Sequence, residues 1–187
     1  MERTDAELIR QCLNGDNLGF DGLVRRYQKP ITGFCYRILG NTDLAADAAQ
    51  EAFVKAYYAL ESFKMDAPFL SWLFRIASNT CIDMTRKQAR RRVDSLDENP
   101  ESAQRLPSGE PSPECVAIKS ESGRLLQKAI LSLPVGYRTL VVLFHYQGMK
   151  IREIAELLNK PEGTVKHGLH AAREMLRRKL QGVIIEI

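Results

Sequence analysis

The stretch IREIAELLNKPEGTVKHGLH, residues 151–170, contains two short amphipathic segments separated by a Pro-Glu-Gly break. In the first segment, Ile151, Ile154, Ala155 and Leu158 fall on one face at the spacing of an α-helix. In the second, the residues that share a face are Val165, Leu169, Ala172 and Leu176. Two helices joined by about three residues, with a small alanine at their contact, predict a helix-turn-helix motif.

The opposite face of the second segment is polar and basic, and it carries Gly163, Lys166, His167, His170, Ala171 and Glu174. A helix-turn-helix would present the start of this helix to the major groove of DNA. A plain helical hairpin with a solvated basic face fits the same pattern, so the pattern alone leaves both interpretations open. His167 and His170 could suggest a metal pair, but no cysteine or carboxylate set accompanies them. We therefore expect exposed polar contacts there, and neither a metal nor a cofactor.

The chain of 187 residues, with net charge +4, divides at a proline-rich segment, SLDENPESAQRLPSGEPSPE, at 95–114. This segment holds four of the eight prolines and has 1 basic and 5 acidic groups, a net charge of −4. It has too few apolar residues to fold by itself, so it is interpreted as a linker. Residues 1–94 carry 14 basic and 12 acidic groups, a net of +2, and residues 115–187 carry 12 and 6, a net of +6. A basic C-terminal unit favours a nucleic-acid partner.

Both units are expected to be helical, because neither an alternating strand pattern nor a glycine-rich phosphate loop occurs. Helices are predicted at about residues 4–14, 17–39, 43–61 and 67–92, and then at about 115–132, 135–147, 151–158 and 161–181. Asp66 is a candidate N-cap for the fourth helix, with Pro68 in its first turn. The expected fold is all-α, with two small helical domains joined by a flexible acidic linker.

The third predicted helix, DLAADAAQEAFVKAYYALESF (43–63), has two distinct faces. The apolar face consists of Ala49, Ala52, Phe53, Ala56 and Leu60. A second face, at the i, i+3, i+4 spacing, consists of Asp47, Gln50, Glu51, Val54, Lys55 and Tyr58. This mixture of acid, amide, valine and tyrosine could dock a partner helix, although an ordinary surface helix remains an alternative.

The fourth predicted helix, APFLSWLFRIASNTCIDMTRKQARRR (67–92), ends in five basic residues out of seven. Its apolar face holds Phe69, Leu73, Ile76, Ala77, Thr80 and Met84. Its other side aligns Arg75, Asn79, Arg86 and Arg90, with Trp72 on the flank and with Phe63 and Lys64 in the preceding loop. Cations beside aromatic rings suit a single nucleic-acid strand, since bases stack on the rings and cations follow the backbone. A lone tryptophan such as Trp72 is, however, more often a core residue.

The cysteines and the N-terminus indicate an intracellular setting. Cys12, Cys35, Cys81 and Cys115 are widely scattered and form no CxxC pair, which favours buried reduced thiols over a redox switch. The N-terminus is polar, and no apolar run approaches the roughly 18 residues of a membrane span. We therefore expect a cytoplasmic protein that does not insert into the membrane.

Three of these motifs together resemble the sigma-70 family of bacterial RNA polymerase initiation factors, of the two-domain extracytoplasmic-function type. DAAQEAFVKAY resembles the family's polymerase-binding helix, FLSWLFRIASNTCIDMTR its promoter-melting helix, and IREIAELLNKPEGTVKHGLHAARE its minus-35-reading helix-turn-helix. The resemblance covers nearly the whole chain apart from the linker. It implies that the protein is a sigma factor with three sets of binding residues, and that it is not an enzyme.

The resemblance implies a role for each set of residues. The set that would bind the clamp of the largest polymerase subunit is Asp47, Gln50, Glu51, Phe53, Val54 and Lys55. The set that would meet the minus-10 region is Phe63, Lys64, Trp72, Arg75 and Asn79 around the melted strand, with Arg86 and Arg90 on phosphates. The set that would meet minus-35 DNA is Arg152, Thr164, Lys166, His167, His170 and Arg173. The polymerase flap region and an anti-sigma factor, which could hold the protein at the membrane, are further expected partners.

The sequence departs from the family pattern at one place. The recognition helix of the family usually has arginines where this chain has Gly168 and Ala171, which implies fewer contacts to the DNA backbone. The alternative function is a stand-alone helix-turn-helix regulator that does not bind core polymerase. A helical RNA-processing enzyme is a third class, for which no catalytic constellation is recognisable in the sequence.

Overall fold

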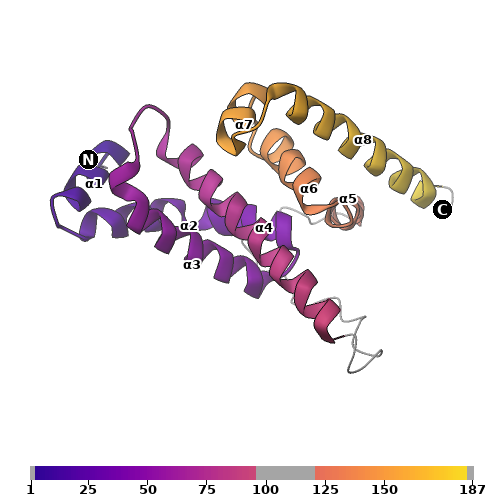
Figure 1. Cartoon of the computed structure of the whole chain (residues 1–187), viewed down its shortest axis with the longest axis horizontal. Coiled ribbons are helices and arrows are strands. Elements are labelled where there is room, and N and C mark those ends of the chain that lie inside the picture. The colour runs from indigo at the N-terminus through magenta and orange to yellow at the C-terminus, as the bar shows by residue number, and fades with distance from the viewer. Residues whose placement is uncertain (1–2, 96–120, 185–187) are drawn as a thin grey trace.

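The computed structural model describes residues 3–95 and 121–184, and they form helices joined by short turns (Figure 1). The elements are α1 (Asp5–Leu13), α2 (Leu18–Leu39), α3 (Thr42–Ala59), a short 3-10 turn η1 (Leu60–Ser62), α4 (Phe69–Ser95), α5 (Glu121–Leu131), α6 (Val135–Val141), a π-helical turn η3 (Val142–Tyr146), α7 (Ile151–Leu158) and α8 (Glu162–Ile184). The described residues contain no strand, so the predicted all-α fold class is confirmed. None of these described helices combines the length and apolar character that a membrane crossing would need.

The first half of the molecule is built from α1 to α4. Thr4 begins α1 with a reciprocal cap, in which its hydroxyl accepts from the Glu7 N–H and the Glu7 carboxylate accepts from the Thr4 N–H. α1 packs so closely on α2 at Gly19 that a Cβ at this position would lie 2.3 Å from the Leu8 carbonyl oxygen. Only glycine fits at that crossing.

Helix α3 lies at the centre of the first half and packs against both α2 and α4. Its buried face is mostly alanine, which allows the neighbouring helix backbones to approach closely; the buried residues are Ala45, Ala48, Ala49, Ala52, Phe53 and Ala56. Ile31, Phe34 and Ile38 of α2 and Leu73 and Phe74 of α4 complete this core. The predicted apolar face of α3 is therefore the one that is buried.

The start of α4 differs from the prediction that Asp66 caps it. The helix begins at Phe69, and the Pro68 carbonyl accepts the first helical hydrogen bonds from the N–H groups of Ser71 and Trp72. A proline disfavours helical backbone in the residue before it, here Ala67, so the helix cannot extend back to Asp66. The expected N-cap at Asp66 was wrong for this reason.

The second half contains α5 to α8. The predicted helix at 135–147 is divided into α6 and the π-helical turn η3, and Gly148 then adopts a positive φ of 67°. Val165 and Leu169 of α8 are buried with Ile154 and Ala155 of α7, as the sequence pattern predicted. The part of the helix predicted at 115–120, and the linker at 95–114 beyond Ser95, lie outside the described residues.

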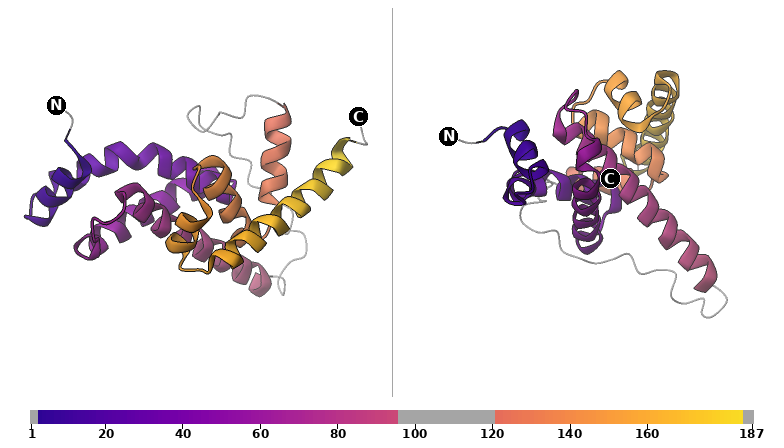
Figure 2. Two further views of the ribbon diagram at one scale, coloured as in Figure 1. Left: turned by 90° about the horizontal axis from the view of Figure 1, so that it is seen from above. Right: turned by 60° about the vertical axis from the view of Figure 1, so that its left-hand side comes forward.

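The two halves pack against each other (Figures 1 and 2). α4 lies beside α7, and the end of α2 lies against α5 and α6. A continuous cluster of buried apolar side chains therefore runs from Phe74 in α4 to Leu140 in α6 and Leu157 in α7. A smaller cluster, formed by Ile130, Leu133, Val141 and Ala172, belongs to the second half alone.

Candidate nucleic-acid and protein interfaces

The candidate protein-binding face lies on the side of α3 that points away from the core. The structure places Asp47, Gln50, Val54, Lys55 and Tyr58 on the exposed side of the helix, with Glu51 half-buried. Tyr58 is 81% exposed and Val54 49% exposed. Phe53, in contrast, is buried and supports the helix from the core. Val54 and Tyr58 are four residues apart, so the two exposed apolar side chains lie next to each other on one side of the helix.

Lys55 has two partners within the chain. Its ammonium group lies 2.7 Å from Glu51 Oε1 and donates a hydrogen bond of 3.2 Å to Thr80 Oγ1 on α4. Thr80 is buried, so this bond satisfies a hydroxyl that has left water. Lys55 thereby links the candidate protein-binding helix to α4, a connection that the helical pattern of α3 did not indicate.

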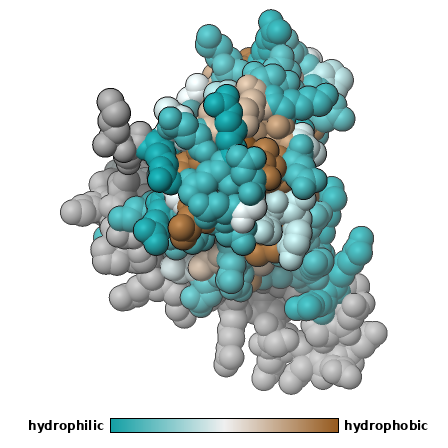
Figure 3. Space-filling view, turned by 90° about the vertical axis from the view of Figure 1, so that its left-hand side faces the viewer, coloured by the Kyte–Doolittle hydropathy of each residue, from teal (hydrophilic) through white to brown (hydrophobic). Residues whose placement is uncertain are grey.

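The structure adds Leu18 and Tyr57 to this face. The Tyr57 hydroxyl donates to Asn17 Oδ1 at 2.9 Å, and its ring contacts those of Phe20 and Tyr58. Leu18, which follows Asn17, is 67% exposed. Figure 3 shows apolar side chains reaching the surface among hydrophilic ones at the end of the molecule that carries α1. Sequence analysis missed these two residues, because the contact between α2 and α3 is what brings them together.

Aromatic rings gather at the start of α4 and in the loop before it. The ring centres of Phe63 and Trp72 are 5.1 Å apart, and those of Phe69 and Trp72 are 5.5 Å apart. Phe69 is fully buried, whereas Phe63 and Trp72 are half-buried. Trp72 thus packs part of its ring on the core, as a core residue would, and leaves another part accessible for stacking.

Polar side chains continue from this aromatic cluster along α4. Lys64, Arg75, Asn79, Arg86 and Arg90 are all exposed, as the predicted strand-binding face requires. Arg86 lies 4.0 Å from Asp83, a long and exposed ion pair that constrains it little.

The loop before α4 holds an unusual backbone conformation. Met65 has φ of +24°, which side-chain-bearing residues rarely adopt. Such strained residues are retained where the surrounding structure fixes them, often at functional sites. The loop also carries Phe63 and Lys64, two of the residues that sequence analysis selected.

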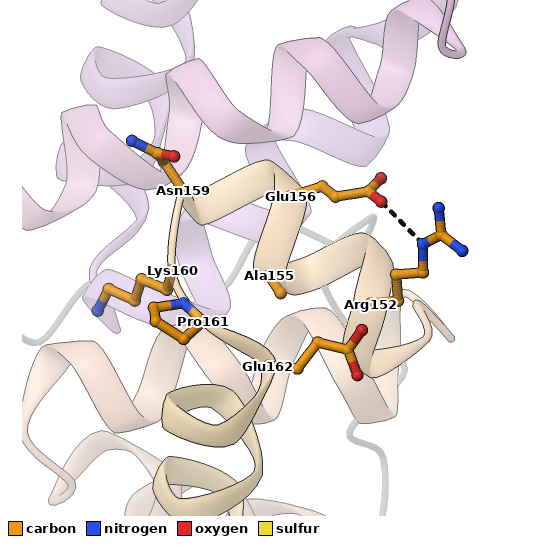
Figure 4. A pocket seen from close by; sticks show the side chains of 7 residues that line it. All are labelled: Arg152, Ala155, Glu156, Asn159, Lys160, Pro161 and Glu162. Atoms are coloured by element: carbon orange, nitrogen blue, oxygen red, sulfur yellow. Dashed lines mark hydrogen bonds and ion pairs between the residues drawn. The ribbon is translucent and has the colours of Figure 1, made fainter.

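Helices α7 and α8 form the expected helix-turn-helix (Figure 4). Asn159 ends α7 in the left-handed conformation, with φ 51° and ψ 53°. The Lys160 N–H then bonds to the Ala155 carbonyl at 2.9 Å, and the Pro161 carbonyl accepts from the N–H groups of Thr164 and Val165. This tight turn leaves an open pocket of about 460 Å³ beside Arg152, Glu156 and Glu162.

Two of the candidate DNA-contacting cations have carboxylate partners on their own helix. Arg152 Nε donates to Glu156 Oε1 at 2.9 Å, which raises the pKa of Arg152 (Figure 4). Lys166 lies 3.8 Å from Glu162. Both pairs have the i, i+4 spacing and are exposed, so a phosphate can compete with the carboxylate for either cation.

The remaining candidate residues of α8 lie on its exposed face. They are Thr164, His167, His170 and Arg173. The Arg173 guanidinium sits over the ring of Phe144, 5.5 Å from the ring centre, and is thereby oriented by η3.

Gly168 does not lie on this face. It is buried against α6, and a Cβ there would come within 2.5 Å of Leu140 Cδ1 and 3.7 Å of the Tyr137 ring. The expectation that Gly168 removes a DNA-backbone contact is therefore wrong, because this position faces the protein core. Ala171 is half-buried.

Two of the cysteines meet in the core. Cys35 of α2 and Cys81 of α4 are both fully buried, and the contact with Cys81, together with burial, raises the pKa of the Cys35 thiol. Burial also raises the pKa of the half-buried Cys12. A thiol that stays protonated is a poor nucleophile, in keeping with structural cysteines. Cys115 lies outside the described residues.

Comparison with known protein families gives two matches. The model of sigma-70 region 2 matches residues 23–91, and the model of sigma-70 region 4 matches residues 123–176. The first match contains the candidate faces of α3 and α4, and the second contains the helix-turn-helix.

Full-length relatives are similar over almost the entire chain. The ECF RNA polymerase sigma factor SigW of Bacillus subtilis (strain 168) is 38% identical, with 97% of this chain and 99% of SigW covered. The ECF RNA polymerase sigma-E factor of Escherichia coli (strain K12) is 36% identical, with 97% and 96% covered.

Two solved structures have a similar fold. CnrH, in complex with the cytosolic domain of CnrY, has a TM-score of 0.64 and 25% identity over 95% of this chain and 97% of CnrH. The sigma factor RpoE of Bartonella quintana, in complex with the anti-sigma factor NepR, has a TM-score of 0.68 and 24% identity over 87% of this chain and 96% of RpoE.

Proposed function

Because this chain belongs to the sigma-70 family of RNA polymerase sigma factors, of the extracytoplasmic-function type, we propose that three of its helices divide the work of initiation. It is a sigma factor and directs transcription initiation. In the proposal, α3 binds core RNA polymerase, α4 holds the opened minus-10 strand, and α8 reads the minus-35 element. Residues 1–94 and 115–187 are taken as the two functional domains.

The main support for the proposal is the exposed face of α3, which suits binding to core polymerase. Asp47, Gln50 and Glu51 offer hydrogen-bond acceptors and donors beside the exposed apolar side chains of Val54 and Tyr58. A helix with this mixture suits a partner helix that has both basic and apolar residues, such as a coiled coil of the polymerase clamp. Phe53 supports the face from the core, and Lys55 positions it against α4 through Thr80.

The geometry of α4 suits a single DNA strand. Phe63 and Trp72 provide half-buried rings on which bases can stack, and Lys64 and Arg75 lie near them in one groove. Asn79 would contact a base edge, while Arg86 and Arg90 would hold phosphates further along the helix. Contacts between these cations and phosphates do not depend on the base sequence. The bases would therefore be recognised at the aromatic end of α4.

The helix-turn-helix suits the major groove. Arg152, Thr164, Lys166, His167, His170 and Arg173 would contact minus-35 DNA, and all six are exposed. Arg152 and Lys166 would exchange their carboxylate partners for phosphates on binding.

Two further partners follow from the family. RpoE and CnrH were each solved in complex with a second protein, which is an anti-sigma factor in the first case. An anti-sigma factor is therefore a proposed partner here, in a stress or envelope response, and the polymerase flap is the proposed partner of the second domain. Sigma factors are not enzymes, and we propose no reaction for this chain.

The test is a measurement of affinity for core polymerase by the double variant Gln50→Ala/Glu51→Ala. We expect the affinity to fall roughly 30-fold or more, since losing one partner of an interfacial charged pair costs about 2 kcal/mol or more. Glu61→Ala, which removes an exposed carboxylate just beyond α3, is the matched control and should bind like the wild type. Unchanged affinity of the double variant, with its helicity intact, would refute the role of α3.

A further inference from the structure

The π-helical turn η3 brings a histidine to the side of α8 that carries Arg173. In this turn the Gln147 N–H bonds to the Val142 carbonyl, five residues back, at 3.1 Å, so the turn is wider than that of an α-helix. Phe144 is half-buried in this turn, and His145 beside it is exposed. Such widened turns are frequent at functional sites.

The Phe144 ring contacts both His145 and Arg173. The His145 ring meets it edge-on, with 4.9 Å between the ring centres and an angle of 82° between the planes. The Arg173 guanidinium lies over the same ring, 5.5 Å from its centre. An imidazole from η3 and a guanidinium from α8 are therefore neighbours on the exposed side of the helix-turn-helix.

The charge of Arg173 acts on His145. Partial burial, and after it the positive charge of Arg173, lower the pKa of the His145 imidazole below its ordinary value. In the free chain the imidazole is therefore mostly neutral at neutral pH.

Other charged groups on the elements around η3 have partners elsewhere. They are Arg37 of α2, which lies over the Tyr146 ring; Arg138 of α6, which donates to the carbonyls of Ile38, Leu131 and Leu133; Glu153 of α7, which accepts from the Lys150 N–H; Arg152 and Glu156 of α7, which pair with each other; and Glu174 of α8, which pairs with Arg177.

We propose that His145 and Arg173 together hold one phosphate of the minus-35 duplex, and that DNA binding takes up a proton at His145. The inference rests on the proposed function of α8. A phosphate held by Arg173 lies beside His145, where its negative charge favours the imidazolium form and offsets the repulsion from Arg173. The imidazolium then donates a charge-assisted hydrogen bond to a phosphate oxygen.

This contact makes binding tighter in acid. Since the pKa of His145 is lower in the free chain than in the DNA-bound chain, the gain in affinity is fully present below the free-chain value. It is lost as the pH rises through the DNA-bound value. A pKa that rises by about one unit on binding changes the affinity by up to about tenfold. Lysine and arginine keep their charge throughout this range.

The test measures the fluorescence anisotropy of a labelled duplex titrated with the full-length chain, at about pH 5.5 and about pH 8. A duplex of mixed sequence is sufficient, because a phosphate contact does not depend on the bases. His145→Gln keeps a polar side chain that does not titrate. The chain has three histidines, so the double variant His167→Gln/His170→Gln leaves His145 as the only one. Circular dichroism verifies that each variant keeps its helices.

We expect the affinity of the wild type to fall up to about tenfold more than that of His145→Gln between the two pH values. At the higher pH the two proteins should bind nearly alike. The double variant should bind more weakly than the wild type but retain the fall in affinity that His145 causes. Its single imidazole signal in nuclear magnetic resonance should titrate at higher pH with duplex than without.

His145→Lys supplies the positive charge at every pH in this range. It should bind at the higher pH more tightly than the wild type does, and its slope of log affinity against log salt should steepen by roughly 0.9 for one added phosphate contact. Ser122→Lys, which adds the same charge at an exposed position of α5, is the matched control and should leave the slope unchanged.

Two results for His145→Gln would overturn the inference. Wild-type pH dependence would assign the proton to another group, and an equal loss of affinity at both pH values would mean that His145 only supports the fold. If His145→Gln loses helicity, the imidazole titration of the double variant decides the question, and an unchanged titration with duplex counts against the inference.

Lys166→Ala separates the inference from the proposed function. It removes a proposed phosphate contact of α8 and should weaken binding at both pH values. If Lys166→Ala and the double variant both bind like the wild type, α8 does not hold the duplex, and the proposed function fails together with the inference. If they bind weakly while His145→Gln keeps the wild-type pH dependence, only the inference fails.

Discussion

Single side chains in this protein are held by short-range partners that control what they can bind. Arg152 bonds to Glu156, and Lys55 bonds to both Glu51 and Thr80. Gly168 has the opposite role, since it is the absence of a side chain that lets α8 approach Leu140. Helical periodicity alone therefore does not distinguish an exposed residue that can contact DNA from a residue that is packed against another helix.

Gly168→Arg is expected to destabilise the fold and to leave the salt dependence of DNA binding unchanged. Overpacking a well-filled contact costs about 1–3 kcal/mol, and the new side chain would start against Leu140 rather than against DNA. Urea unfolding measures the change in the free energy of unfolding. His170→Arg, at an exposed position of the same helix, should stay within about 0.5 kcal/mol of the wild type. Wild-type stability together with a steeper salt slope would show that residue 168 faces DNA.

Glu156→Gln is expected to tighten binding to promoter duplex several-fold. The substitution frees Arg152 from its carboxylate and removes a negative charge from the DNA-facing side. If one more phosphate is neutralised, the slope of log affinity against log salt steepens by roughly 0.9. Anisotropy titrations of the full chain at several salt concentrations measure both quantities.

The matched control for this prediction is Glu174→Gln. Glu174 pairs with Arg177 at 3.6 Å. It lies about three turns beyond Glu162, where α8 begins. It should change neither the affinity nor the slope. Equal effects of the two substitutions would mean that the gain comes from net charge and not from release of Arg152.

Whole helices in this protein each expose one face for binding and bury another for support. α4 packs Leu73, Ala77 and Cys81 on the core while Arg75 and Asn79 remain in water. The aromatic cluster fixes the start of the same helix. The proposed strand-binding face of α4 is thus held at a defined position relative to α3, to which the hydrogen bond from Lys55 to Thr80 joins it.

Asn79→Ala is expected to reduce promoter opening more than it reduces initial binding of duplex DNA. Asn79 is exposed, so its loss leaves the fold intact and removes at most one contact to an unpaired base. The population of open complexes should fall by up to about tenfold, as for one lost hydrogen bond. Permanganate reactivity of the melted bases, measured with core polymerase, reports this population. Arg90→Ala provides the contrast: it removes an exposed cation that is proposed to hold a phosphate, and it should weaken initial binding as well.

Open complexes of Asn79→Ala that react with permanganate like the wild type would remove this residue from the strand-binding set. A parallel loss of initial binding would instead assign it to the DNA backbone.

In the molecule as a whole, the buried apolar side chains are divided unequally between the two halves. The first half buries Ile31, Phe34, Phe69 and Leu73 completely or almost completely. The cluster that belongs to the second half alone contains four buried residues, and the rest of its apolar surface is shared with the first half. The second half therefore depends on its contact with the first for part of its stability.

We expect amide hydrogen exchange to be faster in α7 and α8 than in α2 and α3. Local opening requires less free energy where fewer apolar contacts are broken, so protection factors should be at least about tenfold lower in the second half. Exchange followed by mass spectrometry on the full chain measures this difference. Minus-35 duplex should slow exchange in α8, because a ligand that binds only the folded state stabilises it. Equal protection in the two halves would show that they unfold as one unit.

The sequence by itself determined the all-α fold, the helix-turn-helix and the exposed faces of α3 and α4, because helical periodicity decides which side chains share a face. It did not determine the side on which Gly168 lies, since a glycine has no side chain whose hydropathy could indicate a direction. The bond from Lys55 to Thr80 and the capping of α2 by Gln127 and Arg138 join residues 25, 90 and 100 positions apart. Only the tertiary structure decided these contacts, because they depend on how separate helices pack and not on the spacing of residues within one helix.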